Sequence, residues 1–261
     1  MTNSENRDRK PEVLSSPKWV RVYLGGEAVA DSKNSLLLRA QGRLPVYYFP
    51  PADVRMELLE PAGDEDVAEQ GEGPWPDPPR EKRVFTVRAG DAVAENAAWQ
   101  VEESSEHPEL EGYVAFAWQA MDAWFEEDYQ IRVHPHDPYH LIDVRPSSRH
   151  VRVIVDGETV AETQRPVLLF ETGLPTRYYI PMMDVRMDLL EEGSRTTHCA
   201  YKGTAPHYSV RIGDHAAENI AWRYPFPNPG YEPIQNLLAF YQERIDDFYV
   251  DGERIEKVNT E

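Results

Sequence analysis

The chain has 261 residues, a formal net charge of −19 and a single cysteine. One cysteine excludes an intrachain disulfide and favours a reducing, cytoplasmic location, and no stretch approaches the roughly 18 apolar residues of a membrane-spanning helix. The N-terminus lacks the apolar run of a signal peptide, and so acidic a chain repels phosphate backbones; we therefore expect neither a membrane nor a nucleic-acid partner.

The chain contains two copies of one domain. Residues 20–60 align with residues 151–191 without a gap, at an offset of 131 and with 20 of 41 positions identical. The match resumes at an offset of 123, where Val87–Trp99 meets Val210–Trp222. Positions shared by both copies report on the fold. Positions found in one copy alone are where we look for a site.

The sequence predicts a linear organisation around these repeats. Composition suggests a disordered tail at residues 1–17, a first repeat at 18–127, an ordered linker at 128–150, a second repeat at 151–252 and a tail at 253–261. The first repeat carries an acidic, proline-rich insert at 61–79, which we expect to be disordered because only Trp75 could anchor it.

Each repeat begins with a predicted hairpin. Residues 20–24 and 151–155 are β-branched, and each run meets a two-residue turn, Gly25-Gly26 or Asp156-Gly157. A third strand follows at 36–38 and 167–170. A fourth, at 46–49 and 177–180, ends at Pro50 or Pro181, because proline cannot donate to a strand ladder.

The next segments, 54–59 and 185–190, alternate apolar and charged residues, which favours a strand over a short helix. A strand would place Asp184 and Arg186 on one face, as it would Asp53 and Arg55 in the first copy. We favour a structural ion pair at these residues over a ligand contact, and Arg186 remains a candidate to supply charge to a ligand.

Each copy is predicted to end in a helix. After Pro233, one stripe of helical spacing carries Ile234, Leu237, Leu238, Tyr241, Ile245 and Phe248. The first copy repeats the pattern from Gly112 to Phe125. The predicted fold class is mainly β, with two tandem antiparallel domains that each have a C-terminal helix.

The segment Thr196–Gly203 of the second repeat is the strongest candidate for chemistry. If it is extended, Cys199 and Tyr201 share one face while His198 and Lys202 share the other, so a Cys199–His198 pair would require a turn. Cys199 fits either a small buried hydrophobe or a reactive thiolate. Lys202, just before Gly203, fits either an exposed charge or a lysine held in a turn toward an anionic ligand.

Tyr201 and Tyr224 have no counterpart in the first copy, which also lacks Lys202. This joint absence indicates that they serve one pocket. The predicted catalytic candidates are Cys199 and Lys202, and the predicted ligand-binding residues are Tyr179, Arg186, His198, Tyr201, Lys202, Tyr208, Trp222 and Tyr224.

The residue types that zinc prefers occur at His134, His136, His140, His198, Cys199 and His207. They fall on separate segments and lack the spacing of a zinc site, so we expect neither a metal nor another cofactor.

Several separated motifs occur in the order of a known family. Tyr178-Tyr179, Asp184-Val-Arg-Met-Asp-Leu-Leu190, Thr197-His-Cys-Ala-Tyr-Lys-Gly203 and Asn219-Ile-Ala-Trp222 together resemble the domain of unknown function 427, in its tandem two-copy form. The resemblance implies an antiparallel β domain similar to the β-tent folds, several of which hold zinc through cysteine pairs that are absent here. The family that it resembles also carries the name of a nucleotidyltransferase. Such enzymes need a Gly-Ser turn ahead of paired aspartates, whereas Gly193-Ser194 follows Asp184 and Asp188.

Three functions remain open. The leading hypothesis is a small, anionic ligand bound in an aromatic pocket of the second repeat. The alternatives are an enzyme that uses Cys199 or Lys202 as its reactive group, and a protein-interaction module that uses the acidic insert. The sequence leaves the ligand and the oligomeric state undefined.

Overall fold

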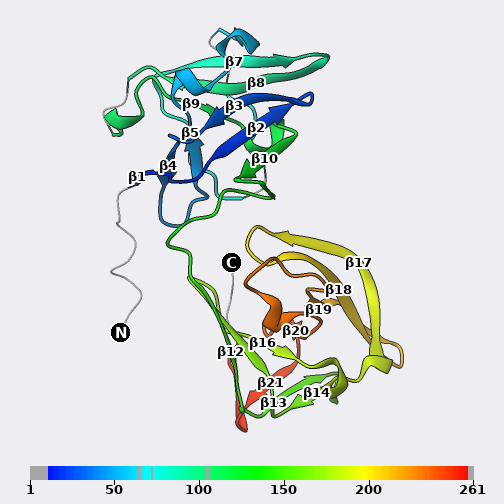
Figure 1. Ribbon diagram of the computed structural model, residues 1–261. Coiled ribbons are helices and arrows are strands. Elements are labelled where there is room, and N and C mark those ends of the chain that lie inside the picture. Colours follow the sequence, from blue (N-terminus) through cyan, green and yellow to red (C-terminus); the bar gives the residue numbers. More distant parts are fainter. Residues whose placement is uncertain (1–10, 64–65, 72, 104–105, 258–261) are drawn as a thin grey trace. The chain divides into compact units, whose positions relative to one another are not determined.

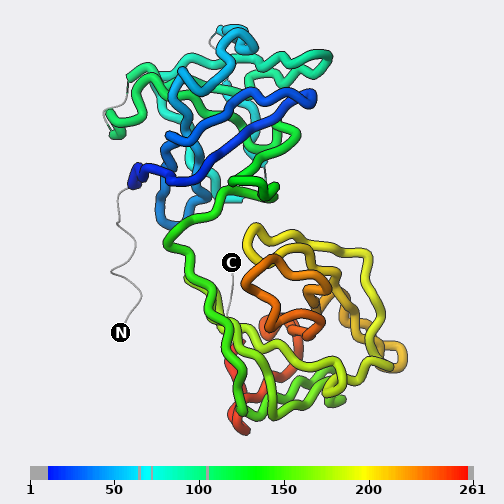
Figure 2. The backbone as a smooth tube through the Cα atoms, in the orientation of Figure 1, coloured from blue at the N-terminus to red at the C-terminus, as the bar shows by residue number. Residues whose placement is uncertain are grey.

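The computed structural model describes residues 11–63, 66–71, 73–103 and 106–257 (Figures 1 and 2). The chain divides into two compact units, Met1–Asp137 and Pro138–Glu261, so the division falls inside the predicted linker. Each unit contains one repeat. Within the described ranges, every helix is too short or too polar to cross a membrane.

The second repeat is built on a seven-stranded antiparallel sheet (Figure 1). Its strands in spatial order are β12 (Ile142–Pro146), β15 (Val167–Glu171), β16 (Arg177–Ile180), β20 (Leu238–Phe240), β19 (His215–Arg223), β18 (Gly203–Ile212) and β17 (Leu190–Cys199). Strands β17, β18 and β19 are the longest, with ten, ten and nine residues. The turn between β17 and β18 contains the candidate segment.

The first repeat has the same strand order in two pieces. One sheet is β1 (Glu12–Ser15), β4 (Leu36–Arg39) and β5 (Val46–Tyr48); the other is β9 (Val114–Phe116), β8 (Ala92–Val101), β7 (Lys82–Ala89) and β6 (Leu59–Pro61). A single bridge joins them, in which Phe49 and Val114 exchange backbone hydrogen bonds of 2.7 and 2.9 Å. The duplication in sequence is therefore a duplication of topology.

A four-stranded antiparallel sheet completes each repeat. In the first repeat its order is β11 (Tyr129–Ile131), β10 (Ala123–Glu126), β2 (Val20–Leu24) and β3 (Glu27–Ser32). In the second it is β22 (Glu253–Arg254), β21 (Asp247–Val250), β13 (Val151–Val155) and β14 (Glu158–Thr163). The predicted hairpins β2–β3 and β13–β14 are confirmed, and their turn residues have the positive φ that such turns require.

The predicted C-terminal helices are wrong. Residues 232–250 form the short 3-10 helix η7 (Glu232–Ile234) and strands β20 and β21, and the first repeat has η3 (Pro108–Leu110), β9, η4 (Trp118–Ala120) and β10 at the equivalent place. Each strand is only three or four residues long. Short strands separated by turns can bury residues three or four apart, and this spacing imitates the stripe of a helix.

The segments that alternate apolar and charged residues are also not strands over most of their length. They contain the 3-10 helices η2 (Met56–Leu58) and η6 (Met187–Leu189), and each follows another 3-10 helix, η1 (Pro51–Asp53) or η5 (Met182–Asp184). The predicted pairing of Asp184 with Arg186 is therefore wrong. Asp184 accepts hydrogen bonds from Thr163 and Arg165, and Arg186 pairs with Asp188 at 2.6 Å.

The shared asparagines have a structural role in both repeats. Asn96 and Asn219 adopt φ of 53° and 52° where the β7–β8 and β18–β19 ladders shift register. The backbone N–H of each donates to a hydroxyl on the neighbouring strand, Thr86 or Ser209. Asparagine tolerates the left-handed region better than most residues, which suits it to these irregular positions.

The long sheet of the second repeat has an apolar cluster on each face. One face belongs to a core that includes Tyr178, Tyr208 and Phe248, and the other to a cluster that includes Tyr179, Trp222 and Tyr224. Neighbouring residues such as Tyr178 and Tyr179 enter different cores because successive strand side chains point to opposite faces. This alternation decides which of the candidate residues can meet.

The described part of the insert is packed, contrary to the expectation of disorder. Val67, Ala68 and Trp75 pack on the first core, and the Trp75 ring stacks on Trp118 with centroids 6.0 Å apart. Strands extend into both predicted tails, since Glu12–Ser15 forms β1 and Glu253–Arg254 forms β22. Residues 1–10 and 258–261 of the predicted tails lie outside the described residues.

Candidate functional site

The candidate segment folds into a tight turn at the end of a long hairpin. Cys199 of β17 pairs with Gly203 of β18, and residues 200–202 form the turn between them. Gly203 has φ +103°, and a Cβ there would lie 3.1 Å from Oδ1 of Asn228. Both the backbone conformation and the close approach favour glycine at this position.

Asn228 holds this turn through three consecutive carbonyls. Its backbone N–H donates to the Lys202 carbonyl at 3.0 Å, and its side-chain amide donates to the carbonyls of Tyr201 and Ala200 at 2.9 and 3.2 Å. These bonds satisfy carbonyls that a strand ladder would otherwise use. The turn is therefore fixed by contacts from a distant loop.

Lys202 is buried in a charged pair. The side chain of Lys202 is 9% exposed, that of Glu171 is 7% exposed, and the Lys202 ammonium donates to Oε2 of Glu171. Oε1 of the same carboxylate lies 3.0 Å from Nε2 of His140. An ionised carboxylate only accepts, so this histidine nitrogen carries the proton.

The pKa of Glu171 reflects this arrangement. Burial alone would raise the pKa of the carboxyl, but the His140 hydrogen bond and the Lys202 charge outweigh burial and lower it below 4.5. Glu171 is thus held as a carboxylate between two donors.

His140 also contacts the turn, through stacking of its ring on a side chain of the turn. Its imidazole stacks on the Tyr201 phenol with centroids 4.5 Å apart and planes inclined by 23°. His140 lies just ahead of β12. The N–H of its neighbour Leu141 donates to the Thr172 hydroxyl, and the Thr172 N–H donates to the Leu141 carbonyl. The linker therefore contributes a side chain to the second repeat.

Cys199 joins the turn to the aromatic cluster. It packs, half-buried, against a cluster made of Leu169, Tyr179, Ala205, Trp222, Tyr224, Ile234 and Ala239. Burial raises the pKa of the Tyr179 and Tyr224 phenols, and the charge of Glu171 raises both further. We call Lys202, Glu171, His140, Tyr201 and Cys199 the Lys202 site, with this cluster as its apolar base.

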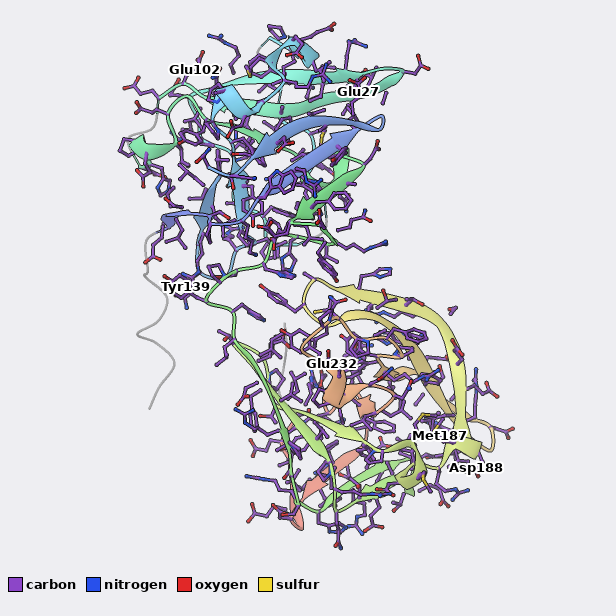
Figure 3. All side chains as sticks on the ribbon, in the orientation of Figure 1. Glu27, Glu102, Tyr139, Met187, Asp188 and Glu232 are labelled. Carbon is purple, nitrogen blue, oxygen red and sulfur yellow. The ribbon has the colours of Figure 1, made fainter. Side chains whose placement is uncertain are left out.

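Three predicted ligand-binding residues do not join the Lys202 site. Tyr208 lies in the opposite core, where its hydroxyl accepts from Arg223 at 2.5 Å. His198 is exposed and hydrogen-bonds to Thr204. Arg186 precedes β17 and Lys202 follows it, and ten strand residues separate them by roughly 30 Å. Figure 3 marks Arg186's neighbours Met187 and Asp188 at that distant end of the hairpin.

Three site residues were missed in the sequence analysis: Glu171, Asn228 and, except as a metal ligand, His140. Glu171 left a signal, because the ungapped alignment places it against Ala40. An acid at the end of a strand in only one copy could have been paired with the lysine that is also found in only one copy. Asn228 left no signal, since its role depends on a loop contact.

The described residues contain no group of three or more His, Cys, Asp and Glu side chains placed to hold a metal ion.

A sequence comparison decides the family. The profile described as domain of unknown function (DUF427) matches residues 12–127 and again residues 143–251. The chain belongs to this family. Each match covers one structural repeat, so this DUF427 protein is a tandem two-copy form, as its motifs suggested. No curated protein matches its sequence.

Proposed function

We propose that the second repeat binds a small anionic molecule at the Lys202 site. The observation that carries the proposal is a buried ammonium placed at the edge of an aromatic cluster by a turn that only this repeat has. Structural needs rarely favour a buried lysine, because its charge must be desolvated and paired.

The first repeat lacks the polar groups of the Lys202 site, and this difference supports a functional role for them in the second repeat. The first repeat has Ala40 where the second repeat has Glu171 and Val101 where that repeat has Tyr224, and it has the insert in place of the turn that carries Tyr201 and Lys202. Both repeats nevertheless keep the same strand order. The fold therefore does not need these polar groups, and a shared task explains their occurrence together in one repeat.

The chemistry of Lys202 favours an anion or a strong acceptor as the ligand group. An ammonium has three N–H donors, and Glu171 takes one of them. The other two suit a carboxylate or phosphate oxygen.

An exposed aromatic residue lies beside the same turn. Phe226 is 84% exposed, and its carbonyl lies 3.4 Å from the position that a Cβ on Gly203 would occupy. Single exposed aromatic side chains are common, but one whose backbone borders this turn is available for the apolar contact that a ligand body needs.

The thiolate hypothesis has less support. Nucleophilic cysteines are activated by an adjacent base or cation. Among the described residues, no hydrogen bond or ion pair involves the Cys199 sulfur. Cys199 instead packs against aromatic rings, so we assign it to the apolar base of the Lys202 site.

The test is a thermal-shift screen of the full chain with small organic carboxylates and phosphate monoesters. We expect at least one to raise the melting temperature of the wild-type protein. The same compound should leave the double variant Lys202→Met/Glu171→Gln unchanged, and it should bind Phe226→Ala about fivefold more weakly, in line with a lost aromatic contact of about 1 kcal/mol.

Arg186→Met is the matched control, because it removes a cation that lies at the other end of the hairpin. It should bind as the wild type does. If no anion binds, or if Arg186→Met reduces binding as much as the Lys202 variants do, the proposal fails.

A further inference from the structure

The first repeat contains a hollow of about 460 Å³. Its apolar wall is formed by Leu38 and Ala40 at the end of β4 and by Pro78 and Pro79 just before β7. Leu38 is buried, and the other three residues are half-buried. We call this space the first-repeat hollow.

The first-repeat hollow lies where the first repeat corresponds to the Lys202 site. Ala40 is equivalent to Glu171 at the offset of 131, and Pro78 and Pro79, in the insert, fall opposite Tyr201 and Lys202 when the offset of 123 is counted back from Val87. His107, which also lines the hollow, precedes η3 as Tyr231 precedes η7. Small residues replace the large polar side chains here, and this substitution leaves open space.

The rim of the hollow is charged. The carboxylates of Asp77, Glu81, Glu103 and Glu106 line it together with the guanidiniums of Arg43 and Arg80, and all six residues are exposed. Four negative and two positive groups leave two net negative charges. Among the described residues, no ion pair involves any of the six, so the carboxylates are open to an outside partner.

The insert contributes Asp77, Pro78 and Pro79 to the hollow and is tied to the repeat beside it. The Leu44 N–H donates to the Pro74 carbonyl at 2.9 Å, and an Arg43 guanidinium N–H donates to the Trp75 carbonyl at 3.3 Å. Trp75 itself is stacked on Trp118. The prolines that follow Trp75 are thus held against β4 rather than left in solvent.

We propose that the first-repeat hollow is a separate binding site, and that its ligand is a small organic cation. The apolar body of such a molecule would lie on Leu38, Ala40 and the two prolines. Its ammonium would lie at the rim among the carboxylates. The two repeats would then bind ligands of opposite charge at equivalent places, which gives a physical reason for keeping both copies.

The probe for this proposal is 2-phenylethylamine, titrated calorimetrically into the full chain at about 0.15 M salt, where diffuse attraction to an acidic protein is largely screened. The matched probe is 3-phenylpropanoate, an anion of similar size. We expect saturable binding of one amine per chain and no competition by the anion.

Two sets of variants locate the site. Glu81→Gln/Glu106→Gln should weaken amine binding at least fivefold, and Ala40→Phe should abolish it by filling the hollow. Glu95→Gln/Glu109→Gln changes the net charge equally at exposed positions that do not line the hollow, and it should bind as the wild type does.

Three results would overturn the proposal: no saturable binding of the amine, equal weakening in the two charge variants, or wild-type affinity in a folded Ala40→Phe. Circular dichroism establishes folding of each variant. The charge variants alter only surface side chains, so they test the proposal even if Ala40→Phe does not fold. The outcome is independent of the Lys202 site, which can bind its anion whether or not the amine binds.

Discussion

The pairing of Glu171 with Lys202 is the residue-scale feature on which the second site depends. Removing one partner of a buried pair leaves an uncompensated charge, whereas removing both is often tolerated. We predict that Glu171→Gln destabilises the protein by about 3 kcal/mol, and that Glu171→Leu/Lys202→Met destabilises it less. Urea unfolding followed by circular dichroism measures both. A double variant less stable than the single variant would contradict this view of the pair.

The same pair predicts a pH dependence. The pKa of Glu171 is lowered in the folded chain from 4.5, so its contribution to stability is fully present above pH 4.5 and is lost as the pH falls through the folded pKa. The difference in melting temperature between wild type and Glu171→Gln should therefore be constant at neutral pH and shrink below about pH 4.5. A difference that grows on acidification would contradict this assignment.

The residue types at the site could be predicted from the sequence, but their partners could not. Lys202, Tyr201 and Tyr224 stood out because the other repeat lacks them. Glu171 lies 31 positions before Lys202 and meets it only because β15 and the β17–β18 turn come together in the folded repeat. Arg186 looked equally available in the sequence, and the length of β17 separates it from the site.

The turn between β17 and β18 is the element that forms the site, and Asn228 holds it. We predict that Asn228→Ala, which removes two side-chain hydrogen bonds to the turn, costs about 2 kcal/mol locally. Hydrogen exchange of the amides near residues 199–204 should accelerate, while the β13–β14 hairpin keeps its protection. Unchanged exchange at the turn would show that the hairpin alone fixes its shape.

Elements were predictable where local chemistry decides them and not where packing does. The β2–β3 and β13–β14 hairpins were correct because their turn residues adopt positive φ almost regardless of context. The C-terminal helices were wrong because β20 and β21 are too short to show alternation, and their burial comes from the sheets they join. Backbone pairing with β19 and β13 overrode the helical spacing.

At the scale of the whole molecule, each repeat has its own apolar core. The first core draws on residues 20–131, and the two clusters of the second repeat draw on residues 151–250. Leu110 and Ile234 are equivalent, and each is completely buried in its own repeat. We predict that Leu110→Ala and Ile234→Ala each cost about 2–5 kcal/mol, because each opens a cavity.

Hydrogen exchange followed by mass spectrometry shows which repeat each of these two variants destabilises. Leu110→Ala should raise exchange in peptides of residues 20–131 only, and Ile234→Ala in peptides of residues 151–250 only. Loss of protection across both repeats in either variant would show that they unfold as one cooperative unit.

The duplication gave the topology of both halves and the general location of the second site. It did not show that the equivalent place in the first repeat is open, because a hollow results from the sizes of side chains that meet only in the folded chain. In the sequence, Ala40, Pro78 and Pro79 lack the polar side-chain groups of Glu171, Tyr201 and Lys202. In three dimensions they create space.

The measurement that tests the central claim most directly is a two-dimensional NMR titration of the full chain with the carboxylate or phosphate that raises its melting temperature most. We predict that chemical-shift changes centre on residues 199–204, Phe226 and the end of β15, and that they disappear in Lys202→Met/Glu171→Gln. Changes centred on residues 186–188, or changes that persist in the double variant, would contradict the assignment of the Lys202 site as the place where this protein binds its ligand.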